Sequence, residues 1–311
     1  MIPVIDAGAL LDSDSMHHEE MQETVAKAAT GVGFMVVENT PISANTVAKL
    51  IEHYRSFFYL SDVIKSKFDM AKTGSNRGWG ASGSEQVDPD ANPDFKQVFD
   101  CGSTLSDKDP SAALNLPAYA PNLWPDTPAG FSDAVKAYYE ESTAFALDLL
   151  CAIAGGVGED PHYFRDQFSR PMALLRGNFY PERPSWAGAK DFGIAPHTDY
   201  GCLTLLATDG SPGLEVRLRG GGWEPVTVGP GAFVINFGEM LEFWTDGKIK
   251  ATPHRVVGSS EERISVPLFF NPNHDTNIAP TKSKDVIQAV DHLQKRYSET
   301  YVHLKASRTF E

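Results

Sequence analysis

The stretch His197-Thr198-Asp199, followed by His254 and then by Arg263-Ile264-Ser265, carries the most information in this chain. Residues i and i+2 of an extended strand project to the same side, so His197 and Asp199 can reach one metal ion without distorting the backbone. Two imidazoles and one carboxylate can occupy one face of a six-coordinate ferrous ion and leave three positions open. We therefore predict that His197, Asp199 and His254 bind one Fe(II) ion within a region of β-strands.

Arg263 and Ser265 repeat the two-residue spacing shortly after His254. A planar guanidinium can hold a carboxylate by two parallel hydrogen bonds, and a hydroxyl on the same strand face can support it. A single His-x-Asp triplet is common by chance, but of nine histidines only His197 begins one. The ordered combination of motifs therefore predicts a metal site with a docking site for an organic acid beside it.

Further short motifs follow one another along almost the whole chain. They are Ile2-Pro3-Val4-Ile5-Asp6, Gly33 to Asn39, Phe57-Phe58, Arg77-Gly78-Trp79-Gly80, Asn178-Phe179-Tyr180-Pro181, Gly213 to Val216, Val234 to Glu239 and Phe269-Phe270-Asn271-Pro272. With the metal motif, these stretches resemble the isopenicillin N synthase-like class of Fe(II)- and 2-oxoglutarate-dependent dioxygenases. The resemblance implies an oxidoreductase that uses Fe(II), O2 and 2-oxoglutarate to hydroxylate, desaturate or cyclise a small organic molecule, and that releases succinate and CO2.

The resemblance also implies roles for individual side chains. Asn178 and Tyr180 would point into the barrel, where the Tyr180 hydroxyl would donate to the cosubstrate carboxylate that Arg263 and Ser265 hold. No catalytic side chain is expected beyond the metal ligands. Four residues belong to the region that folds over the metal in this family, and each is either a substrate contact or a packing residue: Arg77, Trp79, Lys96 and Phe99.

The pattern of the chain predicts a mainly β fold with flanking helices around a double-stranded β-helix, or jelly-roll, core. Helical spacing occurs from Met21 to Val32, after Ser43, from Phe131 to Leu149 and after Lys284, whereas Thr73 to Pro93 reads as a long loop. We expect one dioxygenase unit over 1–311. Within it, an N-terminal α/β region (1–130) would contribute to the substrate pocket, a jelly roll (170–275) would carry the metal, and a C-terminal helix and tail would span 280–311.

Composition limits the partners of the protein. The 311 residues are 41% hydrophobic, which is enough for a large core, and 27 basic against 41 acidic side chains give a formal charge of −14. This charge repels polyanions, so we expect a small-molecule substrate and neither nucleic acid nor a membrane surface as a partner. The start lacks the features of a signal peptide, and we expect a cytoplasmic protein with free, buried thiols at Cys101, Cys151 and Cys202.

Two alternatives remain open at this stage. One is an oxidase similar to isopenicillin N synthase, which needs no 2-oxoglutarate because the substrate's own carboxylate occupies the Arg263 and Ser265 site. The other is a non-catalytic barrel that binds a metal or small ligand. The intact ligand set and acid-binding pair argue against the second alternative.

Overall fold

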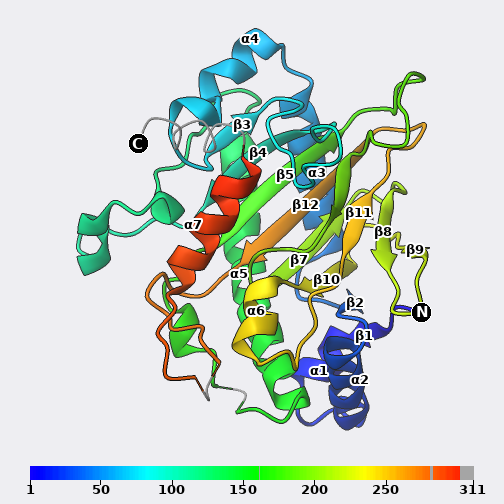
Figure 1. Ribbon diagram of the computed structural model, residues 1–311, viewed down its shortest axis with the longest axis vertical. Helices are drawn as coiled ribbons and strands as arrows, with labels where there is room; N and C mark the ends of the chain where they lie inside the picture. The colour runs from blue at the N-terminus through cyan, green and yellow to red at the C-terminus, as the bar shows by residue number, and fades with distance from the viewer. Residues whose placement is uncertain (161, 281–282, 302–311) are drawn as a thin grey trace.

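The computed structural model describes residues 1–160, 162–280 and 283–301, and in these ranges the strands form two sheets (Figure 1). The larger sheet has eight strands in the order β1-β2-β10-β7-β12-β5-β4-β3, and the smaller has four in the order β6-β11-β8-β9. The strands are β1 (Val4–Asp6), β2 (Phe34–Glu38), β3 (Gly78–Gly80), β4 (Gln97–Gly102), β5 (Leu174–Tyr180), β6 (Ile194–His197), β7 (Leu203–Thr208), β8 (Leu214–Arg217), β9 (Trp223–Pro225), β10 (Phe233–Phe237), β11 (His254–Val256) and β12 (Arg263–Phe270).

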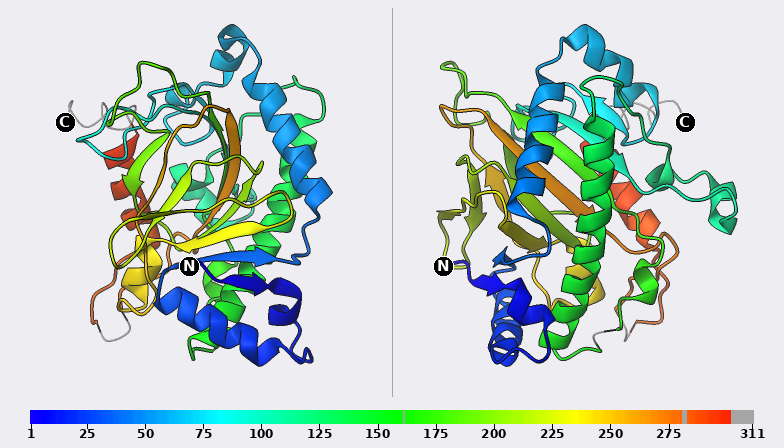
Figure 2. Two further views of the ribbon diagram at one scale, coloured as in Figure 1. Left: turned by 90° about the vertical axis from the view of Figure 1, so that its right-hand side faces the viewer. Right: turned by 180° about the vertical axis from the view of Figure 1, so that it is seen from behind.

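Helices flank the sheets, and Figure 2 shows α3 and α5 lying across the outer face of the larger one. The α-helices are α1 (Ala7–Leu11), α2 (His18–Thr30), α3 (Ala44–Phe58), α4 (Asp62–Lys65), α5 (Phe131–Gly156), α6 (Glu239–Trp244) and α7 (Ala289–Thr300). Short 3-10 turns cover η1 (Ser66–Phe68), η2 (Met70–Lys72), η3 (Pro110–Leu114), η4 (Pro117–Tyr119) and η5 (Asp166–Phe168). Within the described ranges, none of the helices has both the length and the apolar character needed to cross a membrane.

Strand alternation divides the central strands of the larger sheet between two environments. In β12, Ile264, Val266, Leu268 and Phe270 belong to the main hydrophobic core, which also includes residues of α3 and α5. The intervening residues of β12 line a cavity on the opposite face, and β5 alternates in the same way. The residues on the cavity side are Arg263, Ser265, Pro267 and Phe269 from β12, and Leu174, Arg176, Asn178 and Tyr180 from β5. One face of each strand is therefore available for function while the other stabilises the fold.

The architecture confirms the predicted mainly β fold with flanking helices. Ser43 begins α3 as predicted, because its hydroxyl accepts a hydrogen bond of 3.0 Å from the backbone N–H of Thr46. The prediction of one long loop from Thr73 to Pro93 is wrong in part, since β3 lies inside it and pairs with β4. The predicted C-terminal helix begins later than expected, at Ala289, and the predicted tail after Tyr301 lies outside the described residues. The three cysteines are free and buried, as predicted.

Gly177 allows α3 to pack closely on β5. A Cβ atom at Gly177 would lie 2.2 Å from the ring of Tyr54, which is fully buried on α3. Because the ring cannot move out of a packed core without strain, we expect Gly177→Ala to lower the free energy of unfolding by about 1–3 kcal/mol or more. Chemical denaturation measures this change. Gly220→Ala is the control, since a Cβ there meets no atom within 4 Å; equal stability of the two variants would contradict the packing argument.

Candidate metal centre

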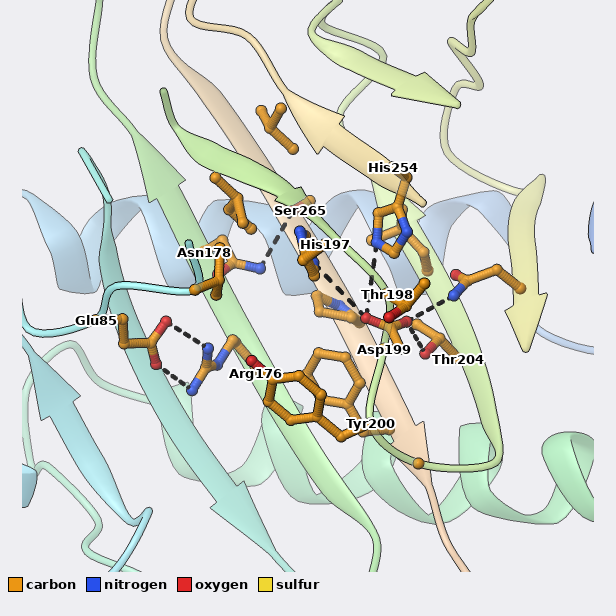
Figure 3. Close-up of a pocket in the computed structure, with 18 of the residues that line it drawn as sticks. Glu85, Arg176, Asn178, His197, Thr198, Asp199, Tyr200, Thr204, His254 and Ser265 are labelled. Carbon is orange, nitrogen blue, oxygen red and sulfur yellow. Dashed lines mark hydrogen bonds and ion pairs between the residues drawn. The ribbon is translucent and has the colours of Figure 1, made fainter. Parts of the chain in front are cut away.

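A cavity lies between the two sheets, and its empty volume is about 960 Å³ including the open mouth. Side chains from both sheets and from α7 line it, and a close-up of this region shows the polar ones converging (Figure 3). Both members of every sequence-predicted pair face this space: His197 with Asp199, Arg263 with Ser265, and Asn178 with Tyr180. The cavity therefore brings the predicted metal ligands and the predicted acid-binding residues together.

His197, Asp199 and His254 meet at one point on the wall of the cavity. His254 in β11 is the direct antiparallel partner of His197 in β6, and Asp199 follows two residues after His197. The Oδ1 atom of Asp199 lies 3.8 Å from Nε2 of His197 and 3.6 Å from Nε2 of His254 (Figure 3). One ligand atom from each of the three residues lies within 4.8 Å of the others.

The hydrogen bonds around these three side chains leave the metal-facing atoms available. Nδ1 of His197 lies 2.8 Å from the carbonyl of Ala195, and Nδ1 of His254 lies 3.2 Å from the carbonyl of Thr252. Each carbonyl can accept only from a protonated Nδ1, which leaves the lone pair on Nε2. Burial, with His254 beside it, lowers the pKa of His197 to about 3, so the imidazole is neutral at pH 7.

Asp199 is oriented by two polar side chains of the larger sheet. Its Oδ2 accepts hydrogen bonds from Oγ1 of Thr204 at 2.5 Å and from Nδ2 of Asn236 at 2.6 Å. Burial raises the pKa of Asp199, but the two imidazoles and these two donors outweigh it and lower the pKa below its ordinary value. The carboxylate is thus held in its charged form with Oδ1 directed at the histidines.

The donor set fits a divalent first-row metal. Histidine nitrogen and carboxylate oxygen bind ions such as zinc at about 2.0–2.2 Å, so two ligands of one ion lie no more than about 4.4 Å apart. The separations of 3.8 and 3.6 Å between Asp199 and the two histidines satisfy this limit. Two histidines and one carboxylate on one side of an open cavity match the ligand type and geometry of non-haem Fe(II) sites.

A second polar group lies on the β5 and β12 face of the cavity. Arg263 stands directly opposite Tyr180 in the register, and Ser265 stands directly opposite Asn178. Asn178 donates from Nδ2 to Oγ of Ser265 at 3.4 Å, and the guanidinium carbon of Arg263 lies 5.3 Å from the centre of the Tyr180 ring. The structure thus brings together the four side chains that the sequence predicted as a group.

Arg263 is buried, with only 3% of its surface exposed. Its Nε and Nη1 have no hydrogen-bond partner among the described residues, and the same holds for Oδ1 of Asn178. Burial lowers the pKa of the Arg263 guanidinium, although Tyr180 and Asp209 oppose this effect. A buried cation with unused N–H groups costs free energy unless an anion binds it, so this arrangement fits a ligand carboxylate.

Of the four predicted substrate contacts, all within the described ranges, only Lys96 lines the cavity. Phe99 packs in the core, where the centre of its ring lies 4.7 Å from the centre of the Phe57 ring. Trp79 in β3 is the direct pairing partner of Phe99 in β4. Arg77 does not line this cavity and donates instead to the backbone carbonyls of Asn76, Ser103 and Ala118. Trp79 and Phe99 therefore pack in the hydrophobic core, and Arg77 hydrogen-bonds to backbone away from the metal-site cavity.

Sequence reasoning missed several functional positions. Thr204 and Asn236 are polar residues inside the apolar runs of β7 and β10, and a buried polar side chain in such a run is a signal for a specific partner. Glu85 and Arg176 also line the cavity and form an ion pair of 2.8 Å. No local pattern marks Glu85, because its partner lies 91 positions away in the chain.

The C-terminal helix closes one side of the cavity and is tied to the metal-binding turn. Leu293, Tyr297 and Thr300 of α7 line the space. Glu239 connects the two parts, since it accepts hydrogen bonds from the Thr198 hydroxyl and from Nη2 of Arg296 in α7. The position of α7 therefore depends on the same turn that presents His197 and Asp199.

Comparison with protein families gives two matches that together cover most of the chain. Residues 171–272 match the 2OG-Fe(II) oxygenase superfamily, and residues 2–127 match the family described as non-haem dioxygenase in morphine synthesis N-terminal. The first match contains the predicted metal ligands and the acid-binding pair.

Characterised relatives are similar over most of their length. An oxoglutarate-dependent flavonoid 7-O-demethylase from Ocimum basilicum is 34% identical over 91% of this chain and 72% of its own. A homoarginine-6-hydroxylase from Glycine max is 31% identical over 90% of this chain and 88% of its own. A Neurospora crassa protein, solved in complex with alpha-KG and thymine, superimposes with a TM-score of 0.83 at 27% identity and covers 96% of this chain and 97% of its own.

Proposed function

The chain belongs to the 2OG-Fe(II) oxygenase superfamily, and from this membership we propose which of its residues carry the reaction and what they do. It is a non-haem Fe(II)- and 2-oxoglutarate-dependent dioxygenase with a jelly-roll core. Within that family we assign the iron ligands to His197, Asp199 and His254. Their convergence supports this assignment, as do the backbone carbonyls that hold Nδ1 of both histidines.

We assign the cosubstrate's far carboxylate to Arg263 and Ser265, with Tyr180 and Asn178 beside them. The observation that carries this assignment is the buried Arg263 guanidinium, whose Nε and Nη1 lack partners in the same cavity that the metal ligands face. A dicarboxylic keto acid can bind there at one end and reach the metal at the other. With a metal bound at the other end, the Arg263 guanidinium would neutralise one of its two charges and the metal the other.

The metal, when bound, supplies the oxidising chemistry with O2 and 2-oxoglutarate. The chain's own contribution is to hold the reactants and to exclude competing groups. Thr204 and Asn236 fix the carboxylate of Asp199, and the carbonyls of Ala195 and Thr252 fix the two imidazoles. The apolar part of the lining, which includes Phe34, Leu206 and Val256, limits the access of water to the reacting carbon.

The substrate is a small organic molecule, which is hydroxylated or, after the same hydrogen removal, desaturated or cyclised. The relatives named above act on a flavonoid and on homoarginine, and the Neurospora protein binds thymine, all of which are small molecules. Residues from the N-terminal region contribute to the lining of the cavity, which supports the proposed role of residues 1–130: Phe34, Glu85, Val87 and Lys96.

Turnover with candidate substrates tests the proposal. The iron-loaded protein is incubated with 2-oxoglutarate and, separately, with thymine, homoarginine or a methoxylated flavonoid, and succinate is measured by chromatography. We expect one succinate per oxidised product for a true substrate, because decarboxylation of the cosubstrate drives each oxidation. Oxygen consumption with a substrate alone, without any need for 2-oxoglutarate, would instead support the oxidase alternative.

A further inference from the structure

One wall of the cavity carries a set of charged side chains that the proposed function does not use. We call Glu85, Lys96 and Arg176 the charged wall. Glu85 and Lys96 belong to the segment between β3 and β4, and Arg176 belongs to β5. Figure 3 shows Glu85 and Arg176 at one end of the cavity, with the metal ligands toward the other. This end is where a substrate can lie beside the cosubstrate.

Both cations of the charged wall are paired with carboxylates. Nζ of Lys96 lies 2.7 Å from Oε2 of Glu85 and 2.9 Å from Oδ2 of Asp94. Arg176 holds Asp100 by two hydrogen bonds of 2.8 and 2.6 Å and donates to Glu85 at 3.0 Å. These five side chains are all buried. Two cations face three carboxylates, so the cluster has no positive charge left for a ligand.

Arg263 contrasts with the two cations of the charged wall. Among the described residues, Nε and Nη1 of Arg263 have no hydrogen-bond partner, whereas carboxylates hold both cations of the charged wall. Under the proposed function the cosubstrate uses these groups. A substrate carboxylate at the other end would meet Glu85 with no unpaired cation beside it, and a buried anion without a partner costs several kcal/mol.

Glu85 itself offers an acceptor. Its Oε2 atom takes the hydrogen bond from Arg176 and contacts Lys96, whereas Oε1 makes no hydrogen bond although Nη2 of Arg176 lies 2.8 Å away. Burial alone would raise the pKa of Glu85, but Arg176 and Lys96 lower it to about 2. Oε1 is therefore a buried, charged acceptor that makes no hydrogen bond, in a side chain that lines the cavity.

The wall can also donate. The ammonium of Lys96 has three hydrogens, and two carboxylates account for two of them among the described residues. The guanidinium of Arg176 has five N–H groups, and its hydrogen bonds to Asp100, Glu85 and the Tyr301 hydroxyl use four. One acceptor and a small number of donors are thus presented side by side without an excess of positive charge.

We infer that the substrate is an uncharged molecule, such as a carboxamide or lactam, and not a carboxylic acid. Its polar group has an N–H or O–H donor that Glu85 binds. The same group has an acceptor that Lys96 or Arg176 binds. This inference rests on the proposed function, because it assigns the remaining cavity-lining cation, Arg263, to the cosubstrate. The rings of Tyr200 and Tyr297 and the side chain of Leu293 provide apolar contacts for the rest of the molecule.

Matched pairs of probes test the inference. 4-Methylbenzamide with 4-methylbenzoate, and nicotinamide with nicotinate, differ in the polar group and share the ring. Each is titrated into the full chain loaded with Zn(II) and 2-oxoglutarate, which blocks turnover, and binding is followed by ligand-detected NMR. We expect each amide to bind at least about tenfold more tightly than its acid. Tighter binding of the acids, or binding of neither member of any pair, overturns the inference.

Glu85→Gln tests the residue that carries the inference. The change keeps the size of the side chain and removes its negative charge, while Lys96 keeps Asp94 and Arg176 keeps Asp100 as partners. We expect the amide affinity to fall about tenfold and the acid affinity to rise. Glu23→Gln, which breaks an exposed ion pair with Lys27, is the matched control and is expected to change neither affinity. An unchanged preference in folded Glu85→Gln overturns the role of Glu85.

Two further measurements keep the result interpretable. Circular dichroism shows whether Glu85→Gln folds. If it does not fold, the affinities of the parent protein for the matched amides and acids decide the substrate class. Binding of 2-oxoglutarate is measured in the same samples, and the pairs are titrated again without it. Loss of 2-oxoglutarate binding contradicts the proposed function, whereas normal 2-oxoglutarate binding with a preference for the acids contradicts only this inference.

Discussion

Alanine at His197, Asp199 or His254 is expected to lower 2-oxoglutarate turnover by more than about 100-fold, because each side chain supplies one of three protein bonds to the ion. Fe(II) affinity should fall together with turnover. The fold should remain, since the main core lies on the other face of the larger sheet, against α3 and α5. Equilibrium metal binding, succinate formation and circular dichroism measure the three properties.

A surface histidine provides the control for these substitutions. His17 is exposed and pairs with Glu20 at the start of α2, so His17→Ala should retain iron binding and turnover. A folded variant at any of the three ligand positions that bound Fe(II) and formed succinate like the parent protein would remove that residue from the site.

Replacing Arg263 with alanine is expected to weaken the binding of 2-oxoglutarate strongly. Arg263→Ala removes the cation of the proposed cosubstrate site and leaves the far carboxylate buried without a partner, which costs about 3–5 kcal/mol. We therefore expect the KM for 2-oxoglutarate to rise by at least about 100-fold. Steady-state kinetics at several 2-oxoglutarate concentrations separates this KM effect from a change in kcat.

Milder substitutions at the same site separate charge from geometry. Arg263→Lys keeps the charge and loses the planar fork, so its KM should lie between those of the parent and of Arg263→Ala. Ser265→Ala removes one neutral donor and should raise KM by about tenfold. Arg217→Ala, on the exposed edge of β8, should have no effect. Equal and negligible effects of Arg263→Lys, Arg263→Ala and Ser265→Ala would contradict the cosubstrate assignment.

The local geometry of a strand explains why much of the site could be predicted from the sequence. Alternation places His197 with Asp199 and Arg263 with Ser265 on common faces, whatever the rest of the fold is. The register that puts Arg263 opposite Tyr180 could not be read in the same way, because it depends on pairing between segments more than 80 positions apart. The family resemblance supplied that grouping instead.

The same alternation explains why the predicted substrate contacts do not all lie on one face of the sheet. Lys96 and Phe99 are three positions apart around the start of β4, so they project to opposite faces of the sheet. Phe99 enters the aromatic core, and Lys96 reaches Glu85 and Asp94 in the cavity wall. Glu85 escaped prediction because its importance comes from a loop that meets β5 and the end of α7, which no local pattern records.

Titration of 2-oxoglutarate into the anaerobic, Fe(II)-loaded protein tests the central claim most directly. If His197, Asp199 and His254 leave three positions of the ion open and Arg263 holds the far carboxylate, the keto acid will chelate the metal and produce a saturable visible charge-transfer band. The band should require Fe(II) and should weaken strongly in Arg263→Ala at the same 2-oxoglutarate concentration. A protein that binds Fe(II) at these ligands yet shows no band at any 2-oxoglutarate concentration would contradict the account.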